Sequence, residues 1–420
     1  MKKIITMILI VALALTSVFA NGDKEEATQN NVIRFAVWDL QTNGYLTKVK
    51  EAFEAANPDL KLEFIDIPST EYIKKLNVML NGGSDVDVFL SKDADKTKTF
   101  YDRGQLENLK PYIEKAGIDM SVYGGTDANV LYDGGIYGMP VRKDQYVLYY
   151  NTDLFDAAGL PYPDNDMTWA EFEELAGKLT SGEGASKKYG AFIHSWQACV
   201  QNWGVQDGKY TIMDGNYSIF KPYYEMVMRM QDAGSVMDYA TIKSSGIHYS
   251  DPFLQGNVAM LPMGSWFIQT VINRIKSGES HINWNVAVLP HPEDCENGYT
   301  VGSATPVCIN KASTDKDIAW KFVEFLTSDA GATVLAENGQ IPAIADQKYT
   351  EIFAKADGMP EGIMNGLYAA NVSPDRPSMD HVTEIDQMLG QEHSLIMLGE
   401  LSIDEGLAEM ETRFQEIMNK

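Results

Sequence analysis

FLQGNVAMLPMGSW, residues 253–266, raises the question that organises the reading of this chain. The apolar run at 258–261 predicts a buried strand, and the Pro-Met-Gly-Ser that follows predicts its end in a turn. Pockets of α/β proteins tend to lie at the ends of sheet strands. We therefore expect Trp266 to be either a core residue that covers the strand end or a flat platform for a ligand, and we favour the platform.

The part of the chain before this stretch alternates strands with helices. Residues 32–38 and 86–90 are apolar runs typical of buried strands, and residues 61–67 alternate as a strand does. Apolar residues recur at helical spacing between them, at 46–56 and at 69–80. This order predicts an α/β fold whose parallel sheet is covered by helices on both faces.

Two later helices have recognisable starts. A capping box at 168–171 opens a helix that runs through Leu179, and a second one at 402–405 opens the last helix. The buried stripe predicted for that last helix consists of Leu407, Met410, Phe414 and Met418.

Composition limits the possible functions. A chain of 420 residues is long enough for two domains or two lobes. Its 34 basic and 59 acidic residues give a net charge of −25, which argues against a nucleic-acid partner and fits a solvated acidic surface. Three cysteines do not make a disulfide framework; Cys295 and Cys308 could close one loop, which the sequence alone leaves open.

The first residues, MKKIITMILIVALALTSVFANG, predict a signal peptide over 1–20, cut after Ala20. The apolar run is shorter than the roughly 20 residues that span a bilayer. A polar leader at 21–31 is expected to be disordered. No cysteine stands near the cleavage site to carry a lipid, so we expect a free periplasmic protein.

Motifs for catalysis are missing from the sequence. It contains no Gly-x-Ser-x-Gly elbow, P-loop, Gly-x-Gly-x-x-Gly turn or His-Glu-x-x-His. The histidines are scattered and the cysteines lack zinc spacing, so we expect no metal and no cofactor, with calcium held by loop carboxylates as the version hardest to exclude. Since 59 acids will place some pair at glycosidase distance by chance, an exported glycoside hydrolase stays an alternative.

Four blocks, in this order and spacing, cover nearly all of the chain after residue 31. They are DVDVFL (85–90) with GQL (104–106); YGMP (137–140), VLYYNTDLF (147–155), AGL (158–160) and TW (168–169); FLQG (253–256) with GSW (264–266); and VAVLP (286–290), GS (302–303), AWKF (319–322) and NGQIPA (338–343). Together they resemble the extracellular solute-binding proteins of ABC importers, in the carbohydrate-binding, maltose-binding-like group.

The resemblance implies a two-lobed α/β fold with a hinge of several crossings and a ligand cleft between the lobes. The first lobe would comprise 32–142 plus 303–342, and the second 143–302 plus 343–420. It also implies a protein without a reaction of its own, which delivers a carbohydrate to two permease subunits driven by an ATPase. We expect it to act as a monomer.

Sugar sites need aromatic platforms together with carboxylates and amides. The resemblance, read with the residue chemistry, gives the following candidate ligand contacts: Trp38, Asp39, Lys92, Asp93, Asp95, Asp144, Trp196, Gly264, Trp266, Ser303 and Arg376. Alternatives stay open for some of them. Trp38 could be core, and the charges at 92–95 could be a solvated helix start.

Asp144 is the charged candidate with the clearest physical argument. It stands between Val141 and the apolar pair at 147–148, where an unpaired acid is hard to bury. Lys92 occupies the place of a stacking aromatic in the maltose-binding pattern, which argues against maltodextrin. A polyol or glycerol-phosphate ligand is the alternative; a phosphate would require clustered bases, for which Arg142 and Arg376 are the candidates.

Overall fold

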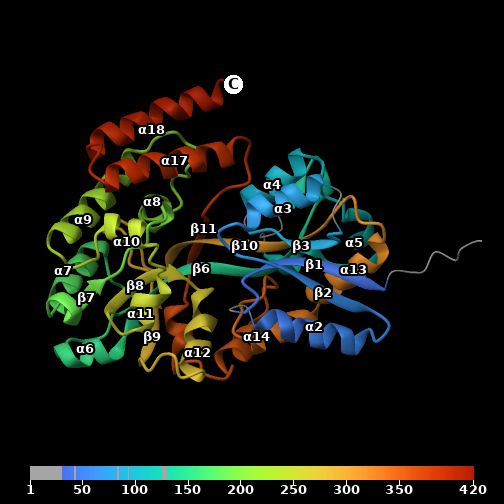
Figure 1. Ribbon diagram of the computed structural model, residues 1–420, viewed down its shortest axis with the longest axis horizontal. Coiled ribbons are helices and arrows are strands. Elements are labelled where there is room, and N and C mark those ends of the chain that lie inside the picture. The colour runs from blue at the N-terminus through green and yellow to red at the C-terminus, as the bar shows by residue number, and fades with distance from the viewer. Residues whose placement is uncertain (1–30, 42–43, 83–84, 93, 125–129) are drawn as a thin grey trace, which may run out of the picture.

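The computed structural model describes residues 31–420 except 42–43, 83–84, 93 and 125–129 (Figure 1). The predicted signal peptide, most of the predicted leader and Asp93 lie outside the described residues. The strands are β1 Val32–Trp38, β2 Lys61–Ile67, β3 Val88–Leu90, β4 Leu131–Tyr132, β5 Gly135–Ile136, β6 Met139–Asn151, β7 Tyr189–Ala191, β8 Val258–Gly264, β9 Trp284–Val288, β10 Tyr299–Ile309 and β11 Asn371–Pro374.

Helices account for much of the rest of the described chain. They are α2 Tyr45–Ala56, α3 Tyr72–Asn81, α4 Ala94–Asp102, α5 Lys110–Ala116, α6 Thr152–Ala158, α7 Trp169–Leu179, α8 Ala198–Val205, α9 Lys221–Asp232, α10 Tyr239–Ser245, α11 Ser250–Leu254, α12 Phe267–Lys276, α13 Lys316–Leu326, α14 Asp329–Glu337, α15 Gln347–Ala354, α16 Ile363–Gly366, α17 Val382–Met397 and α18 Ile403–Met418. Short 3₁₀ turns occur at Met120–Tyr123, Gly184–Ser186 and Ser218–Phe220.

The predicted α/β order of the N-terminal part is confirmed. β1 pairs in parallel with β2 and with β3, and its side chains alternate between two cores. Phe35 and Val37 pack with α2 and α13 on one face, whereas Ala36 packs with α3 and α4 on the other. Figure 1 shows α3 and α4 on the side of these strands opposite to α2.

The remaining strands make the sheet mixed rather than parallel throughout. Its order is β2-β1-β3-β10-β6-β8-β7, with β11 beside β10 and β9 beside β6. β10 runs antiparallel to both β3 and β6, and β6 runs antiparallel to β8 and β9. The βαβα reading could not foresee this, because the antiparallel strands come from later parts of the chain.

β6 and β10 are long because both serve two regions of the sheet. Residues 139–145 of β6 pair with β10, and its residues 146–151 pair with β8 and β9. A third crossing runs beside them, since the Lys143 N–H donates to the Ile341 oxygen and the Ala343 N–H to the Val141 oxygen, both at 3.0 Å. The two lobes are therefore joined by paired, extended segments that pass through the middle of the molecule (Figure 1).

Buried side chains divide into cores on either side of these crossings. The largest core gathers the second half of β6 with β7 to β9, α6 to α12, α17 and α18. A second and a third core line the two faces of β1 and β3. This partition motivates the lobe boundaries expected above, 32–142 plus 303–342 and 143–302 plus 343–420, which stay a prediction at residue level.

Both capping boxes are confirmed. The Thr168 and Ser402 hydroxyls accept from the backbone N–H groups of Glu171 and Glu405, whose carboxylates accept in return. The buried stripe predicted for the last helix is wrong at its final residue, because Met418 is 44% exposed and Ile417 takes the buried position. A step of three residues from Phe414 keeps to the covered side of the helix there, whereas a step of four does not.

The three cysteines are free thiols, so Cys295 and Cys308 do not form a disulfide. Cys308 lies in β10 against the third core, and Cys295 lies in the loop between β9 and β10. Among the described helices, none combines the length and the apolar character that crossing a membrane requires.

Candidate functional site

The first-lobe candidates Trp38, Asp39 and Lys92 are held together by Ser69. An Asp39 carboxylate oxygen accepts from the Ser69 N–H at 2.8 Å, and the Lys92 ammonium donates to the Ser69 carbonyl at 2.7 Å and to its hydroxyl at 2.6 Å. Asp39 adopts a left-handed conformation, with φ of 48°, directly after β1. The turn after the first strand is thus bound to the turn after the third.

Trp38 is half-buried rather than enclosed by core. Its ring meets Tyr72 edge to face at 5.0 Å between centroids, and the Lys92 ammonium stands 5.3 Å from its centroid. Lys92 therefore acts as a cation beside an aromatic face. Of the neighbouring candidates, Asp93 is outside the described residues, and Asp95 belongs to α4 without a described side chain.

Asp144 is buried in β6 and has two partners of its own. One carboxylate oxygen accepts from the Arg142 guanidinium at 2.5 Å, and the other accepts from the Ser265 hydroxyl at 3.2 Å. Burial raises the pKa of Asp144, against the opposite effects of Arg142 and Ser265. The acid that was hard to place in a core is thus placed there with a buried counter-charge two residues away.

Ser303 stands beside Asp144 in the neighbouring strand. The two are register partners across β6 and β10, and Ser303 is half-buried. The preceding Gly302 lies so close to β6 that a Cβ there would be 2.3 Å from the Asp144 carbonyl oxygen. A glycine at 302 therefore lets these two crossing strands approach at the candidate site.

The Gly264-Ser265-Trp266 turn ends β8 as predicted. A Cβ on Gly264 would lie 2.0 Å from the Trp266 ring, so the indole folds back over the glycine. The Trp266 N–H donates to the Tyr249 hydroxyl at 3.2 Å, and the ring meets Tyr146 edge to face at 5.4 Å. Trp266 is half-buried against the second-lobe core, between the two alternatives posed at the start.

Trp266 belongs to a group of rings that we call the aromatic cluster, made of His194, Trp196, His248, Tyr249 and Trp266. Tyr249 is central: its ring centroid lies 4.0 Å from that of His248, 5.3 Å from that of His194 and 5.6 Å from that of Trp196. Trp196, which is 40% exposed, and His248 are the exposed members of the cluster.

Charge and burial tune this cluster. Burial lowers the pKa of His194 to about 3, so its imidazole is neutral at physiological pH. Burial also lowers the pKa of His248, while the Asp251 and Asp39 carboxylates act to raise it. Since Asp39 follows β1, its influence on His248 and Tyr249 indicates that the turn after the first strand lies near the aromatic cluster.

Arg376 is buried and fully engaged within the protein. Its guanidinium donates to Asp386 at 2.5 Å, to Asp375 at 2.6 Å and to the Asn202 side chain at 3.1 Å. Burial opposes its charge, but Asp386 and Asp375 together hold its pKa above the usual value. Asp386 also lies 3.9 Å from the Lys96 ammonium of α4.

Near Arg376, α4 also contacts the start of α17 and the residues just before it. The Lys98 ammonium lies 2.7 Å from Asp380, and the hydroxyls of Thr99 and Thr383 are 3.0 Å apart. Figure 1 shows the start of α17 next to α4. Segments from the two lobes therefore touch on this side of the crossings.

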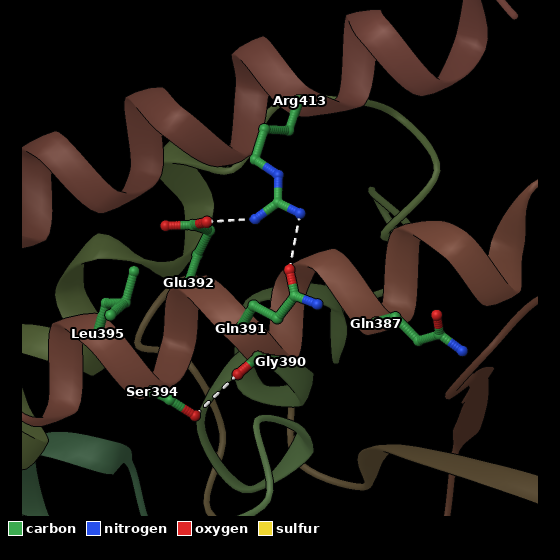
Figure 2. A pocket seen from close by; sticks show the side chains of 7 residues that line it. All are labelled: Gln387, Gly390, Gln391, Glu392, Ser394, Leu395 and Arg413. Carbon is green, nitrogen blue, oxygen red and sulfur yellow. Dashed lines mark hydrogen bonds and ion pairs between the residues drawn. The ribbon is translucent and has the colours of Figure 1, made fainter.

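A depression of about 590 Å³ elsewhere, between α17 and α18, does not gather any of the predicted residues. Figure 2 shows Arg413 of α18 reaching to Glu392 and Gln391 of α17, at 2.5 and 2.7 Å. Its polar groups fasten two helices to each other, so we do not regard it as the functional site.

The structure thus brings the candidates into three groups, which are Trp38, Asp39 and Lys92; Asp144, Ser303 and Gly264; and Trp196 and Trp266 of the aromatic cluster. Arg376 is linked to these groups through its electrostatic interaction with Tyr146. Sequence reasoning missed Tyr146, Ser265, His248 and Tyr249. Only Ser265 had a signal, its place between Gly264 and Trp266.

Two α/β lobes on paired crossing strands, with aromatic and charged side chains from both facing one another there, define a binding protein of the two-lobed type. A family model for bacterial extracellular solute-binding proteins matches residues 39–333. The chain belongs to this family, whose members are extracellular binding proteins. This match confirms the predicted family and the predicted role as a solute-binding protein, and the similar structures confirm the predicted fold.

Similar proteins agree with this membership. A sugar transporter structure from Rhizobium etli, in an open conformation, is 36% identical with a TM-score of 0.77, over 91% of this chain and 99% of that one. A galactooligosaccharide-binding protein of Bacillus subtilis is 23% identical over 91% of this chain and 90% of its own length. A maltodextrin-binding protein of the same organism is 23% identical over 80% and 79%.

Proposed function

We propose that this protein captures a mono- or oligosaccharide between its lobes in the periplasm and delivers it to an ABC permease. The observation that carries the proposal is the aromatic cluster, whose His248 and Tyr249 interact electrostatically with Asp39 of the first lobe, in a chain of this family. Aromatic rings suit the apolar faces of sugars, and the neighbouring polar groups suit their hydroxyls. The sugar-binding names of its relatives support the same class of ligand.

Capture would work as a shift between open and closed lobes. Ligand contacts from both lobes stabilise the closed form only if they bind it more tightly than the open form. The permease, made of two subunits with their ATPase, then recognises the closed monomer. The paired crossings of β6 and β10 serve as the hinge.

The protein performs no reaction in this proposal, and an exported glycoside hydrolase is the rival from another class. The buried carboxylate of the candidate site, Asp144, is already bonded to Arg142 and Ser265. A general acid or nucleophile must instead reach the glycosidic oxygen or carbon. Arg142 and Asp144 therefore fit positioning and stability better than catalysis.

A glycerol-phosphate ligand receives less support. The two arginines that it would need already have partners: Arg142 pairs with the buried Asp144, and Arg376 pairs with the partly buried Asp375 and Asp386. Moving either arginine to a phosphate would deprive a buried or partly buried carboxylate of its counter-charge, which is costly.

A thermal-shift screen of the mature protein tests the proposal. The panel contains glucose, maltotriose, mannotriose, a galactooligosaccharide and glycerol 3-phosphate. A ligand at 100 times its dissociation constant adds about 2.7 kcal/mol to the free energy of unfolding. We expect a sugar to raise the melting temperature and to be recovered unchanged by chromatography. A shift with glycerol 3-phosphate alone would replace the ligand class, and turnover of the sugar would indicate a glycosidase.

A further inference from the structure

A cavity of about 780 Å³ lies against the crossing strands. Its lining includes the strand positions Asp144 and Ser303 but no member of the aromatic cluster. Side chains along β6 alternate between two faces. Arg142, Asp144 and Tyr146 point to the face of Trp266, as their contacts show. Lys143 and Gln145 point to the opposite face, and the Gln145 amide donates to the Leu367 oxygen at 3.0 Å in the cavity wall. The cavity therefore occupies the reverse face of the crossings.

The wall of this cavity is mostly apolar. It includes all three crossings together with α15, α16 and β11, and its apolar side chains include Ile341, Ile344, Phe353, Met364 and Leu367. A volume of this size lies within the range of small-molecule sites, roughly 300–1,000 Å³. The wall thus offers room and apolar contact for a small organic body.

Lys143 supplies the cationic group in this wall. Among the described side chains, none forms an ion pair with its ammonium, and burial, unopposed by any carboxylate, lowers its pKa. Asp346 also lines the cavity, but its carboxylate caps α15 by accepting from the Lys348 N–H at 2.9 Å. The desolvation of Lys143 is therefore not offset within the described protein.

We propose that this cavity binds a small organic anion, with its carboxylate against the Lys143 ammonium and its apolar chain against Ile344, Phe353 and Leu367. An anion would supply the counter-charge that Lys143 lacks, in a site where a charge-assisted hydrogen bond is shielded from water. This is a second site, which shares the strand positions Asp144 and Ser303 with the candidate sugar site but none of the aromatic cluster, and its ligand class differs from that of the proposed function.

Hexanoate is the probe, and hexanamide is its neutral match of similar size and shape. Calorimetric titration of the mature protein should show saturable binding of hexanoate and at least about tenfold weaker binding of hexanamide, or about 1.4 kcal/mol. Lys143→Met, which keeps the length of the side chain and removes its charge, should weaken hexanoate binding by a similar factor. Lys143→Arg should retain it, and Lys311→Met, which changes an exposed lysine at the end of β10, should leave it unchanged.

A second readout reports on Lys143 itself. In NMR spectra of the protein with carbon-13 labelled lysine, the Lys143 signal, assigned by its loss in Lys143→Met, should titrate at higher pH when hexanoate is bound, because an anion favours the charged amine. The proposal is overturned if hexanoate does not saturate the wild-type protein, if Lys143→Met binds it equally well, or if the Lys143 titration does not move.

Discussion

Asp144 of β6 and the second-lobe tryptophans Trp196 and Trp266 were predicted as parts of one ligand site, yet the protein holds the carboxylate and the rings in different ways. Asp144 has both oxygens bonded within the protein, to Arg142 and Ser265. Trp196 presents 40% of its surface and Trp266 is half-buried. A buried, paired charge contributes first to the folded state, whereas an exposed ring is available to a ligand at little cost to the fold. The difference separates residues that shape the site from residues that touch its contents.

The largest effect is expected for Asp144→Ala. This change leaves the Arg142 guanidinium buried without its carboxylate, and breaking a buried pair in this way costs about 3 to 5 kcal/mol of the free energy of unfolding. Urea unfolding of the empty protein measures it. Arg142→Met combined with Asp144→Ala should recover most of the loss, because an apolar replacement of a whole buried pair is often nearly neutral.

The opposite result would contradict the difference proposed between Asp144 and the aromatic rings. If Asp144→Ala lost sugar affinity while the empty protein kept its stability, Asp144 would be a ligand contact of the kind that the sequence indicated, and its bond to Arg142 would be energetically minor.

Trp266→Ala should affect both properties, with affinity affected more. A platform of this kind is a hot spot worth about 2 kcal/mol or more, at least tenfold in the dissociation constant. Its stability cost should stay below the roughly 3 to 5 kcal/mol of a fully interior tryptophan, since Trp266 is half-buried. Calorimetry with the sugar that gives the largest thermal shift, and a melting curve without sugar, separate the two.

Trp169→Ala is the matched control for Trp266, because Trp169 is 4% exposed in the same core and its ring contacts and hydrogen bond are with Phe172, Trp203, Tyr223 and Gln206, none of them a candidate. It should lose stability and keep sugar affinity. The same pattern in Trp266→Ala would make Trp266 a core residue.

Lowering the pH should change the stability contributions of the two regions in opposite directions. Burial lowers the pKa of His194 to about 3, so the unfolded chain binds more protons between about pH 6.5 and 3, and this contribution to stability falls as pH falls through that window. The slope is up to about 1.4 kcal/mol per pH unit. Burial raises the pKa of Asp144, so its contribution instead increases as pH falls.

Urea unfolding from pH 7 to 4 measures these slopes. We expect His194→Gln to flatten the loss of stability in acid. A pH dependence identical to that of the wild type would mean that the buried imidazole does not resist protonation.

The smallest effect is expected for Trp196→Ala. Removing this ring should weaken sugar binding by about 1 kcal/mol, because relatively few contact residues contribute more than that. The free energy of unfolding should change by less than about 0.5 kcal/mol. Tyr210, 41% exposed outside the cluster, is the control, and Tyr210→Ala should change neither quantity. Unchanged affinity in Trp196→Ala would remove Trp196 from the ligand site.

Local patterns predicted local structure well. β1 and β2 begin and end at the predicted residues, and both capping boxes formed, because these signals depend on neighbours in the sequence. The pairing of Asp144 with Arg142 could also have been predicted from the sequence, since side chains two residues apart share a strand face. The partners of Arg376 were not, because Asn202 lies 174 residues away and no local pattern connects them.

The position of β10 in the sheet has a consequence for the time course of synthesis. Leu90 at the end of β3 pairs with Val307, so the strand that separates β3 from β6 emerges from the ribosome more than two hundred residues after β3. Until then β1 is the one neighbour of β3 among the described strands. The N-terminal half of the sheet must therefore wait for most of the polypeptide to be made, and the long loop that its closure spans predicts slow folding.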